Sequence, residues 1–201
     1  MGKVVMPKHS CDLGEIEAVL KVYSSHASWL DNDTFKTELK AIIGSGQYPS
    51  SYTKKVQIPS YFGFTVWKDI TKSHSPRRIT DSGRKFYSAL IAHNQSDVIE
   101  LLVESLEKTI FGRNNCGSPE SDSDVEPPCL AVRGVLDLGY LTPSEFGYLL
   151  YSVADCSDKY ENAIKAIKKA RSKGINIRLS IPADKLASYT DAKPLTFLKK
   201  I

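Results

Sequence analysis

Residues 50–90 read SSYTKKVQIPSYFGFTVWKDITKSHSPRRITDSGRKFYSAL, and this stretch decides the fold class. It predicts a basic helix ending at Gly63, a strand within Phe64–Ile70, a polar turn, a second short strand at Arg78–Thr80 and a capped helix. Pro59 falls inside the first helix, so that helix either kinks or restarts there. Helix, hairpin and helix in this order are typical of the second half of a winged helix-turn-helix.

The residues before this stretch predict two more helices. Asp12 can cap the first helix, and Asp31 or Asn32 begins the second, which stops at Gly44-Ser45-Gly46. We therefore predict that residues 1–93 form a winged-helix DNA-binding domain. The fold class expected for the whole chain is mainly α with a small β-hairpin, a winged helix-turn-helix followed by a helical subdomain.

The second half of the chain predicts helices only. One helix begins at Ser96 or Asp97, another covers Cys129–Leu138, and Thr142-Pro143-Ser144-Glu145 has the residues of a capping box with proline at the first helical position. Between the first two helices, residues 112–128 are polar and rich in turn formers, which predicts a long mobile loop.

A basic helix opening at Ser157 or Asp158 and closing at Gly174 follows. We predict that residues 94–189 form a helical subdomain and that residues 190–201 begin a further, unfinished subdomain. The bases of this helix fit either a solvated outer face or contact with phosphate, and both interpretations stay open; they are Lys165, Lys168, Lys169, Arg171 and Lys173.

Charge is strongly segregated along the chain, although the net charge is only +4. Residues 50–93 carry eight Lys or Arg and two acids, residues 94–150 carry ten acids and three bases, and residues 151–201 are basic again. Two basic regions around an acidic one indicate a molecule with one side that faces a polyanion.

The candidate binding residues follow from the winged-helix hypothesis, in which the third helix enters the major groove and the hairpin lies along the backbone. Gln and Lys can read base edges, whereas Ser, Tyr and Arg mainly position phosphates. The candidates for double-stranded DNA are Ser50, Ser51, Tyr52, Lys54, Lys55, Gln57, Ser60, Arg77, Arg78, Arg84 and Lys85.

Other chemistry finds little support in the sequence. No apolar run approaches the roughly 18 residues of a membrane span, no secretion signal opens the chain, and a cytoplasmic location is expected by default. The four cysteines have no zinc-ligand spacing, so no metal site is expected. Glu38-Leu39-Lys40 and Asp191-Ala192-Lys193 share the end of a nuclease motif but not its context, so no catalytic residue and no cofactor are assigned to this chain.

Two stretches together resemble the recognition region of AlwI-like type IIS restriction endonucleases. The first combines Ile58-Pro59-Ser60-Tyr61-Phe62-Gly63-Phe64 with Arg78-Ile79-Thr80-Asp81-Ser82-Gly83-Arg84-Lys85-Phe86. The second runs from Val135 to Phe146, VLDLGYLTPSEF, before an amphipathic helix. Asp191-Ala192-Lys193-Pro194-Leu195-Thr196-Phe197-Leu198 is similar to the start of a second recognition subdomain. The resemblance covers roughly residues 12–200.

The resemblance implies a sequence-specific double-stranded DNA recognition domain, as the N-terminal part or a fragment of a larger type II enzyme. In that family a separate C-terminal nuclease domain uses Mg²⁺, so a nuclease domain or subunit is an expected partner, whereas a membrane is not. Two other classes stay open. A winged-helix transcription regulator would use its C-terminal half for dimerisation, and a protein-interaction module would use the winged helix only as a scaffold.

Overall fold

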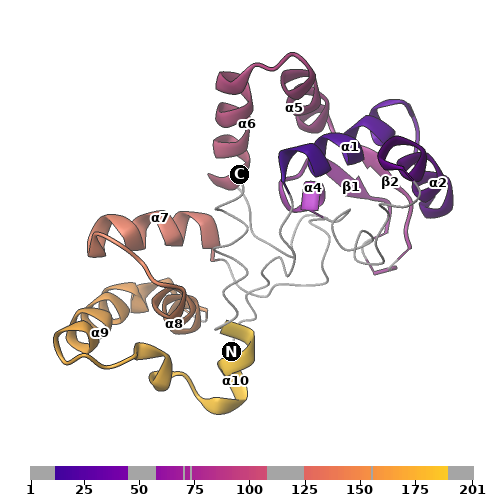
Figure 1. Cartoon of the computed structure of the whole chain (residues 1–201). Helices are drawn as coiled ribbons and strands as arrows, with labels where there is room; N and C mark the ends of the chain where they lie inside the picture. Colours follow the sequence, from indigo (N-terminus) through magenta and orange to yellow (C-terminus); the bar gives the residue numbers. More distant parts are fainter. Residues whose placement is uncertain are drawn as a thin grey trace.

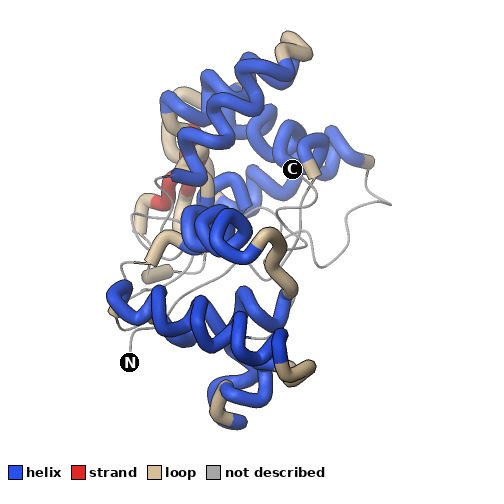
Figure 2. The backbone as a smooth tube through the Cα atoms, turned by 90° about the vertical axis from the view of Figure 1, so that its left-hand side faces the viewer, coloured by secondary structure: helices blue, strands red, loops and turns tan. Residues whose placement is uncertain are grey.

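The computed structural model describes residues 12–44, 58–69, 71–72, 74–107, 125–154 and 156–189. Within these residues the chain is mainly helical, with one two-stranded antiparallel hairpin that occupies a small part of the molecule (Figures 1 and 2). The first half contains α1 (Leu13–Ser24), α2 (Asn32–Ile43), α4 (Ile58–Tyr61), β1 (Thr65–Trp67), β2 (Arg77–Ile79), α5 (Asp81–Ile91) and α6 (Gln95–Glu107). The second half contains α7 (Pro127–Leu138), α8 (Pro143–Val153), α9 (Tyr160–Ser172) and α10 (Ala183–Tyr189), with 3-10 turns at Ser157–Lys159 and Ile177–Ser180.

Side-chain caps fix where most of these helices begin. Asp12 and Thr142 form complete capping boxes with the glutamates three residues later, and Asp31 and Thr80 accept hydrogen bonds from backbone N–H groups of the next turn. Each cap satisfies a donor that the helix geometry leaves without an intrahelical partner. The starts predicted at Asp12, at Asp31 or Asn32 and at Thr142 are confirmed, and the capped helix expected after the hairpin begins after Thr80.

Four predicted boundaries differ from the structure. β2 covers Arg77–Ile79 and not Arg78–Thr80, because Thr80 is the N-cap of α5, and α9 begins at Tyr160 after the 3-10 turn at Ser157–Lys159. α6 begins at Gln95, one or two residues earlier than expected, and its first turn is preceded by Asn94, whose Oδ1 accepts from the Asp97 N–H at 3.4 Å. α7 begins at Pro127, so the predicted loop 112–128 was too long at its end. Proline suits the first turn of a helix because its missing N–H would have no partner there. Residues 112–124 and 190–201 lie outside the described part of the chain.

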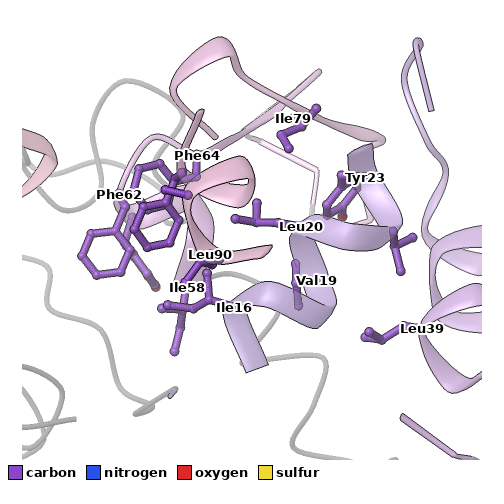
Figure 3. Close-up of a cluster of buried hydrophobic side chains, with 14 of the residues drawn as sticks. Ile16, Val19, Leu20, Tyr23, Leu39, Ile58, Phe62, Phe64, Ile79 and Leu90 are labelled. Atoms are coloured by element: carbon purple, nitrogen blue, oxygen red, sulfur yellow. The ribbon is translucent and has the colours of Figure 1, made fainter. Parts of the chain in front are cut away.

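The first core gathers around α1 and includes buried residues of α2, α4, β2, α5 and α6, with Phe64 from the turn before β1. Figure 3 shows part of this core. Tyr23 stacks on Phe35 with ring centroids 4.6 Å apart, which holds α1 against α2, and Phe64 stacks on Phe86 at 4.3 Å, which holds the hairpin against α5. α6 belongs to this core because Val98 and Leu102 are buried in it. The packing division therefore falls after α6, later than the boundary expected at residue 94.

The turn before β1 and the cap of α5 are joined by a close set of contacts. The Thr80 hydroxyl donates to the Gly63 carbonyl at 2.7 Å and accepts from the Gly83 N–H at 3.0 Å, while the Thr80 N–H donates to the Phe64 carbonyl at 3.0 Å. Gly63 has φ of 70°, a conformation that side chains with a Cβ disfavour. A Cβ on Gly83 would overlap the Phe64 carbonyl oxygen and lie 2.8 Å from its carbon. Glycine is therefore the residue that fits at position 83.

The second core is organised by an ion pair between Glu145 on α8 and Arg171 on α9. Arg171 Nε donates to Glu145 Oε1 at 2.6 Å and its Nη2 to Oε2 at 2.9 Å, and the Glu145 side chain is only 8% exposed. Arg171 also donates to the carbonyls of Leu138 and Tyr140 and lies 3.8 Å from the centre of the Tyr140 ring. One guanidinium thus ties the turn between α7 and α8 to α9.

The electrostatics of Glu145 follow from this geometry. Burial raises the pKa of its carboxyl, but the hydrogen bonds from Arg171 and Thr142 more than offset burial, so the pKa lies below the ordinary glutamate value of 4.5. A lowered pKa means that the carboxylate stabilises the fold above pH 4.5, and that this contribution is lost as the pH falls through the lowered value.

Gly83→Ala tests the contact between the α5 cap and the turn before β1. We expect it to lower the free energy of unfolding by about 2–3 kcal/mol, because the new Cβ forces the backbone of residue 64 to move. Gly14→Ala is the matched control, since its Cβ would meet Asp12 Oδ1 at an ordinary 3.5 Å. Urea unfolding of both variants is the measurement, and a Gly83→Ala protein within about 0.5 kcal/mol of wild type would show that the contact is not tight.

Glu145→Gln tests the second core. We expect a loss of about 2–4 kcal/mol at pH 7, because Arg171 keeps its charge without the carboxylate that compensates it. The gap between wild type and variant should shrink as the pH falls below 4.5. Glu161→Gln is the control, because Glu161 forms a mostly exposed pair with Arg133 at 3.1 Å. A gap that stays constant between pH 7 and about 3 would contradict the lowered pKa.

Candidate nucleic-acid interface

The hairpin is extended by a third segment of chain. β1 and β2 pair antiparallel with Trp67 opposite Arg77 and Thr65 opposite Ile79. On the other edge of β2, the Leu30 N–H donates to the Arg77 carbonyl at 2.8 Å and the Arg77 N–H donates to the Leu30 carbonyl at 3.0 Å. β2 therefore lies between β1 and the link that connects α1 to α2, and the hairpin is fixed to the helices at both of its edges.

Strand alternation separates the two arginines of β2. Arg77 lies on the inward face with Ile79 and is 6% exposed, whereas Arg78 points to solvent. The Arg77 guanidinium lies 3.9 Å from the centre of the Trp67 ring. Burial lowers the pKa of Arg77, and no ion pair joins it to a carboxylate within the described residues.

Three polar atoms on the inward face of the hairpin lack hydrogen-bond partners in the described residues. Arg77 Nε, Trp67 Nε1 and Thr65 Oγ1 are buried and have no hydrogen-bond partner in the described part of the chain. The side chain of Arg77 therefore lies within the fold and not at the surface, where a DNA contact was predicted for it. Successive side chains of a strand point to opposite faces, so Arg77 lies on the same face as the core residue Ile79 and Arg78 lies on the other. This alternation is the sequence signal that could have separated the two arginines.

The exposed bases lie on the outward face of β2 and on the first turns of α5. Arg78 lies over Trp29 with its guanidinium carbon 4.7 Å from the ring centre, and Arg84 and Lys85 are exposed on α5. The cap contact described above fixes α5 against the end of the hairpin, so these three bases sit on one continuous piece of backbone. Aromatic stacking limits the rotamers available to Arg78, which lowers the entropic cost of holding it for a partner.

The turn of the hairpin is organised by Asp69, a residue that was not predicted to have a role. Its Oδ1 accepts from the Thr71 N–H at 3.0 Å and from the Thr71 hydroxyl at 2.7 Å, and these hydrogen bonds lower its pKa. The Asp69 N–H donates to Ser75 Oγ at 2.7 Å, and Lys72 lies 3.3 Å from Oδ2. Aspartate in a turn with Thr two residues later is the pattern that could have found it.

The remaining predicted contact residues divide into two groups. Ser60 is 1% exposed within α4, so its side chain faces the core and not a partner. The other predicted residues of the basic helix lie outside the described residues; they are Ser50, Ser51, Tyr52, Lys54, Lys55 and Gln57.

The described residues show no grouped metal ligands and no membrane-length helix. No three His, Cys, Asp or Glu side chains among them gather closely enough to hold a metal ion. His26 Nε2 lies 2.9 Å from Glu38 Oε2, which joins the end of α1 to α2 as an isolated pair. None of the helices in the described ranges is long and apolar enough to cross a membrane.

Comparisons with protein-family models, with curated proteins and with solved structures find no match to this chain. Any function must therefore be inferred from the geometry and the residues of the chain itself.

Arg77→Gln and Arg78→Gln test the separation of the two arginines. We expect Arg77→Gln to lower the free energy of unfolding by about 1–3 kcal/mol, because it removes a buried side chain and its contact with Trp67. Arg78→Gln should stay within about 0.5 kcal/mol of wild type, as exposed substitutions usually do. Thermal and urea unfolding measure both, and equal losses would contradict the assignment of one inward and one outward side chain.

Proposed function

We propose that the first half of this chain is a winged helix-turn-helix that binds double-stranded DNA in a sequence-specific way. The observation that carries the proposal is the three-segment arrangement around β2. A winged helix consists of a helix, a short strand segment, two further helices and a hairpin, with the first strand segment paired to the last strand. Here α1, the Leu30 link, α2, α4, β1 and β2 follow this order, and Leu30 pairs with Arg77 of β2.

The distribution of charge supports DNA as the partner. Arg78, Arg84 and Lys85 are exposed where a wing and the helix after it would run beside a phosphate backbone. Four exposed acids lie on α6, at Asp97, Glu100, Glu104 and Glu107, whereas Asp81 is the one exposed acid in the described part of the hairpin and α5. A basic surface beside the hairpin and an acidic one on α6 would orient the domain as it approaches a duplex.

Base reading is assigned to the residues that the sequence predicts as a basic helix before α4. In the proposal Ser51, Lys54, Lys55 and Gln57 face base edges in the major groove, and this assignment comes from the sequence alone. The four residues of α4, Ile58–Tyr61, are all buried, so the predicted base-reading residues directly precede a segment that is held in the core. Ser60 and Arg77 are removed from the contact set because the structure buries both.

We further propose that this domain is the recognition part of a type II, IIS-like restriction endonuclease whose Mg²⁺-dependent nuclease domain is supplied elsewhere. The support is the resemblance at Gly63-Phe64 and at Ile79-Thr80-Asp81-Ser82-Gly83. In the structure these residues form the contact that fixes the hairpin to α5. The resemblance therefore supports the proposed fold more directly than the proposed enzyme class. The endonuclease assignment needs a separate test.

A transcription regulator is the second candidate, and one observation favours it. Val132, Val135 and Leu136 on α7 are 61%, 43% and 79% exposed, so α7 has an apolar face that a dimer could bury. The apolar residues of α8 and α9 are mostly buried in the second core, so they do not offer a second such face.

Selection from a randomised duplex library, followed by sequencing of the bound pool, distinguishes these functions. A short asymmetric site is expected for the recognition part of a type IIS-like enzyme. A palindrome with half-sites about one helical turn apart would instead identify the dimeric regulator. A pool without any enriched sequence would overturn sequence-specific recognition.

The Arg78→Gln/Arg84→Gln double variant tests the surface. We expect at least about tenfold weaker duplex binding, and a slope of log K against log salt that is smaller by about 0.9 for each phosphate that the variant no longer neutralises. Lys21→Gln/Lys185→Gln is the control with the same change in net charge, and it should leave the slope unchanged. If the two double variants weaken binding equally, the binding reflects only a general attraction between a basic protein and DNA, and the proposed surface is wrong.

A further inference from the structure

The outer face of α9 carries lysines that no described carboxylate pairs with. Lys165, Lys169 and Lys173 recur every four residues and are exposed, and Lys168 lies beside them. The opposite face is buried in the second core through Tyr160, Ala163, Ile164, Ile167 and Ala170. α9 thus packs on the core along one side, next to α8 (Figure 1), and its lysines are exposed along the other.

Some charged side chains of α9 form ion pairs within the fold, and others do not. Arg171 turns inward to Glu145, and Glu161 pairs with Arg133 of α7 at 3.1 Å. The helix macrodipole favours bases in the last turn, which accounts for Lys169. It does not account for Lys165 and Lys168 nearer the middle of the helix, so the row exceeds what helix stability requires.

The chemistry of this face selects one kind of partner. Protein interfaces are depleted in lysine and use aromatic or aliphatic anchors, and no large apolar side chain is exposed on α9. A helix that lies on a membrane needs a free apolar face, and the apolar face of α9 is already occupied by the core. Lysine, a flexible point charge, instead suits phosphates that repeat along a backbone.

The spacing of the row also suits a duplex. From Lys165 to Lys173 the helix rises about 12 Å, a length over which duplex DNA presents about seven phosphate charges. Three or four ammonium groups can therefore each reach a phosphate without needing a particular base sequence beneath them.

We propose that α9 provides a second contact with the DNA backbone, independent of sequence, through Lys165, Lys168, Lys169 and Lys173. The inference rests on the proposed function, because the duplex held by α9 is the one that the first half recognises. The second contact strengthens binding to DNA that extends beyond the recognised site, and it does not select bases.

The experiment measures duplex binding by the wild-type chain and by the Lys165→Gln/Lys169→Gln double variant. Two duplexes that share the selected site are compared, one about 12 and one about 30 base pairs long, which is roughly one and three helical turns. Wild type should bind the longer duplex at least about fivefold more tightly, with a salt slope steeper by about 3, or about 0.9 for each phosphate contacted. The α9 variant lacks two of the four lysines, so it should lose about half of both differences and keep its preference for the selected site. The Lys21→Gln/Lys185→Gln variant has the same net charge and should behave as wild type.

Each outcome decides between the proposals. If the α9 variant keeps the full length preference and salt slope of wild type, or if the control variant is weakened equally on the longer duplex, the second contact is wrong while recognition by the first half stands. If wild type shows no preference for any duplex sequence but binds the longer duplex more tightly in a way that the α9 variant loses, recognition fails while the α9 contact stands. Unfolding curves of both variants should match wild type, because all four side chains lie on the surface or pair only with exposed groups.

Discussion

The contact between the α5 cap and the turn before β1 is the constraint on which the first half depends. Thr80 bonds to Gly63, to Phe64 and to Gly83 within one turn of helix, and the missing side chain at Gly83 lets α5 approach the Phe64 carbonyl. A two-stranded hairpin is marginally stable alone. This contact, together with the Leu30 pairing on the other edge of β2, attaches the hairpin to the helical core and gives Arg78 a fixed position.

Each half holds one arginine against an aromatic ring while neighbouring bases point to solvent. Arg77 is buried on Trp67 in the first half, and Arg171, which is partly buried, lies on Tyr140 and pairs with Glu145 in the second. Both guanidinium groups make their contacts within the fold, so these two side chains serve the structure. The bases that remain outside, on β2, α5 and α9, form the surfaces to which we assign contact with DNA.

The sequence predicted the parts that local chemistry determines, and it missed those that depend on packing. Caps at Asp12 and Thr142 are local, so the helices that they begin were predicted correctly. The place of α6 in the first core depends on Val98 meeting α5, which no local pattern encodes. At the site, the prediction treated Arg77 and Arg78 alike because both are basic. The structure buries Arg77, because it pairs with Trp67 on one side and with Leu30 on the other.

Amide hydrogen exchange with and without a selected duplex tests the central claim most directly, because it reports for each backbone segment where the partner lies. We expect slower exchange over β2 and the first turns of α5 when duplex is added, with α6 unchanged. Slower exchange on α6 or α7 with none on β2 and α5, or no change anywhere at saturating duplex, would contradict the claim that the hairpin and α5 form a DNA-binding surface.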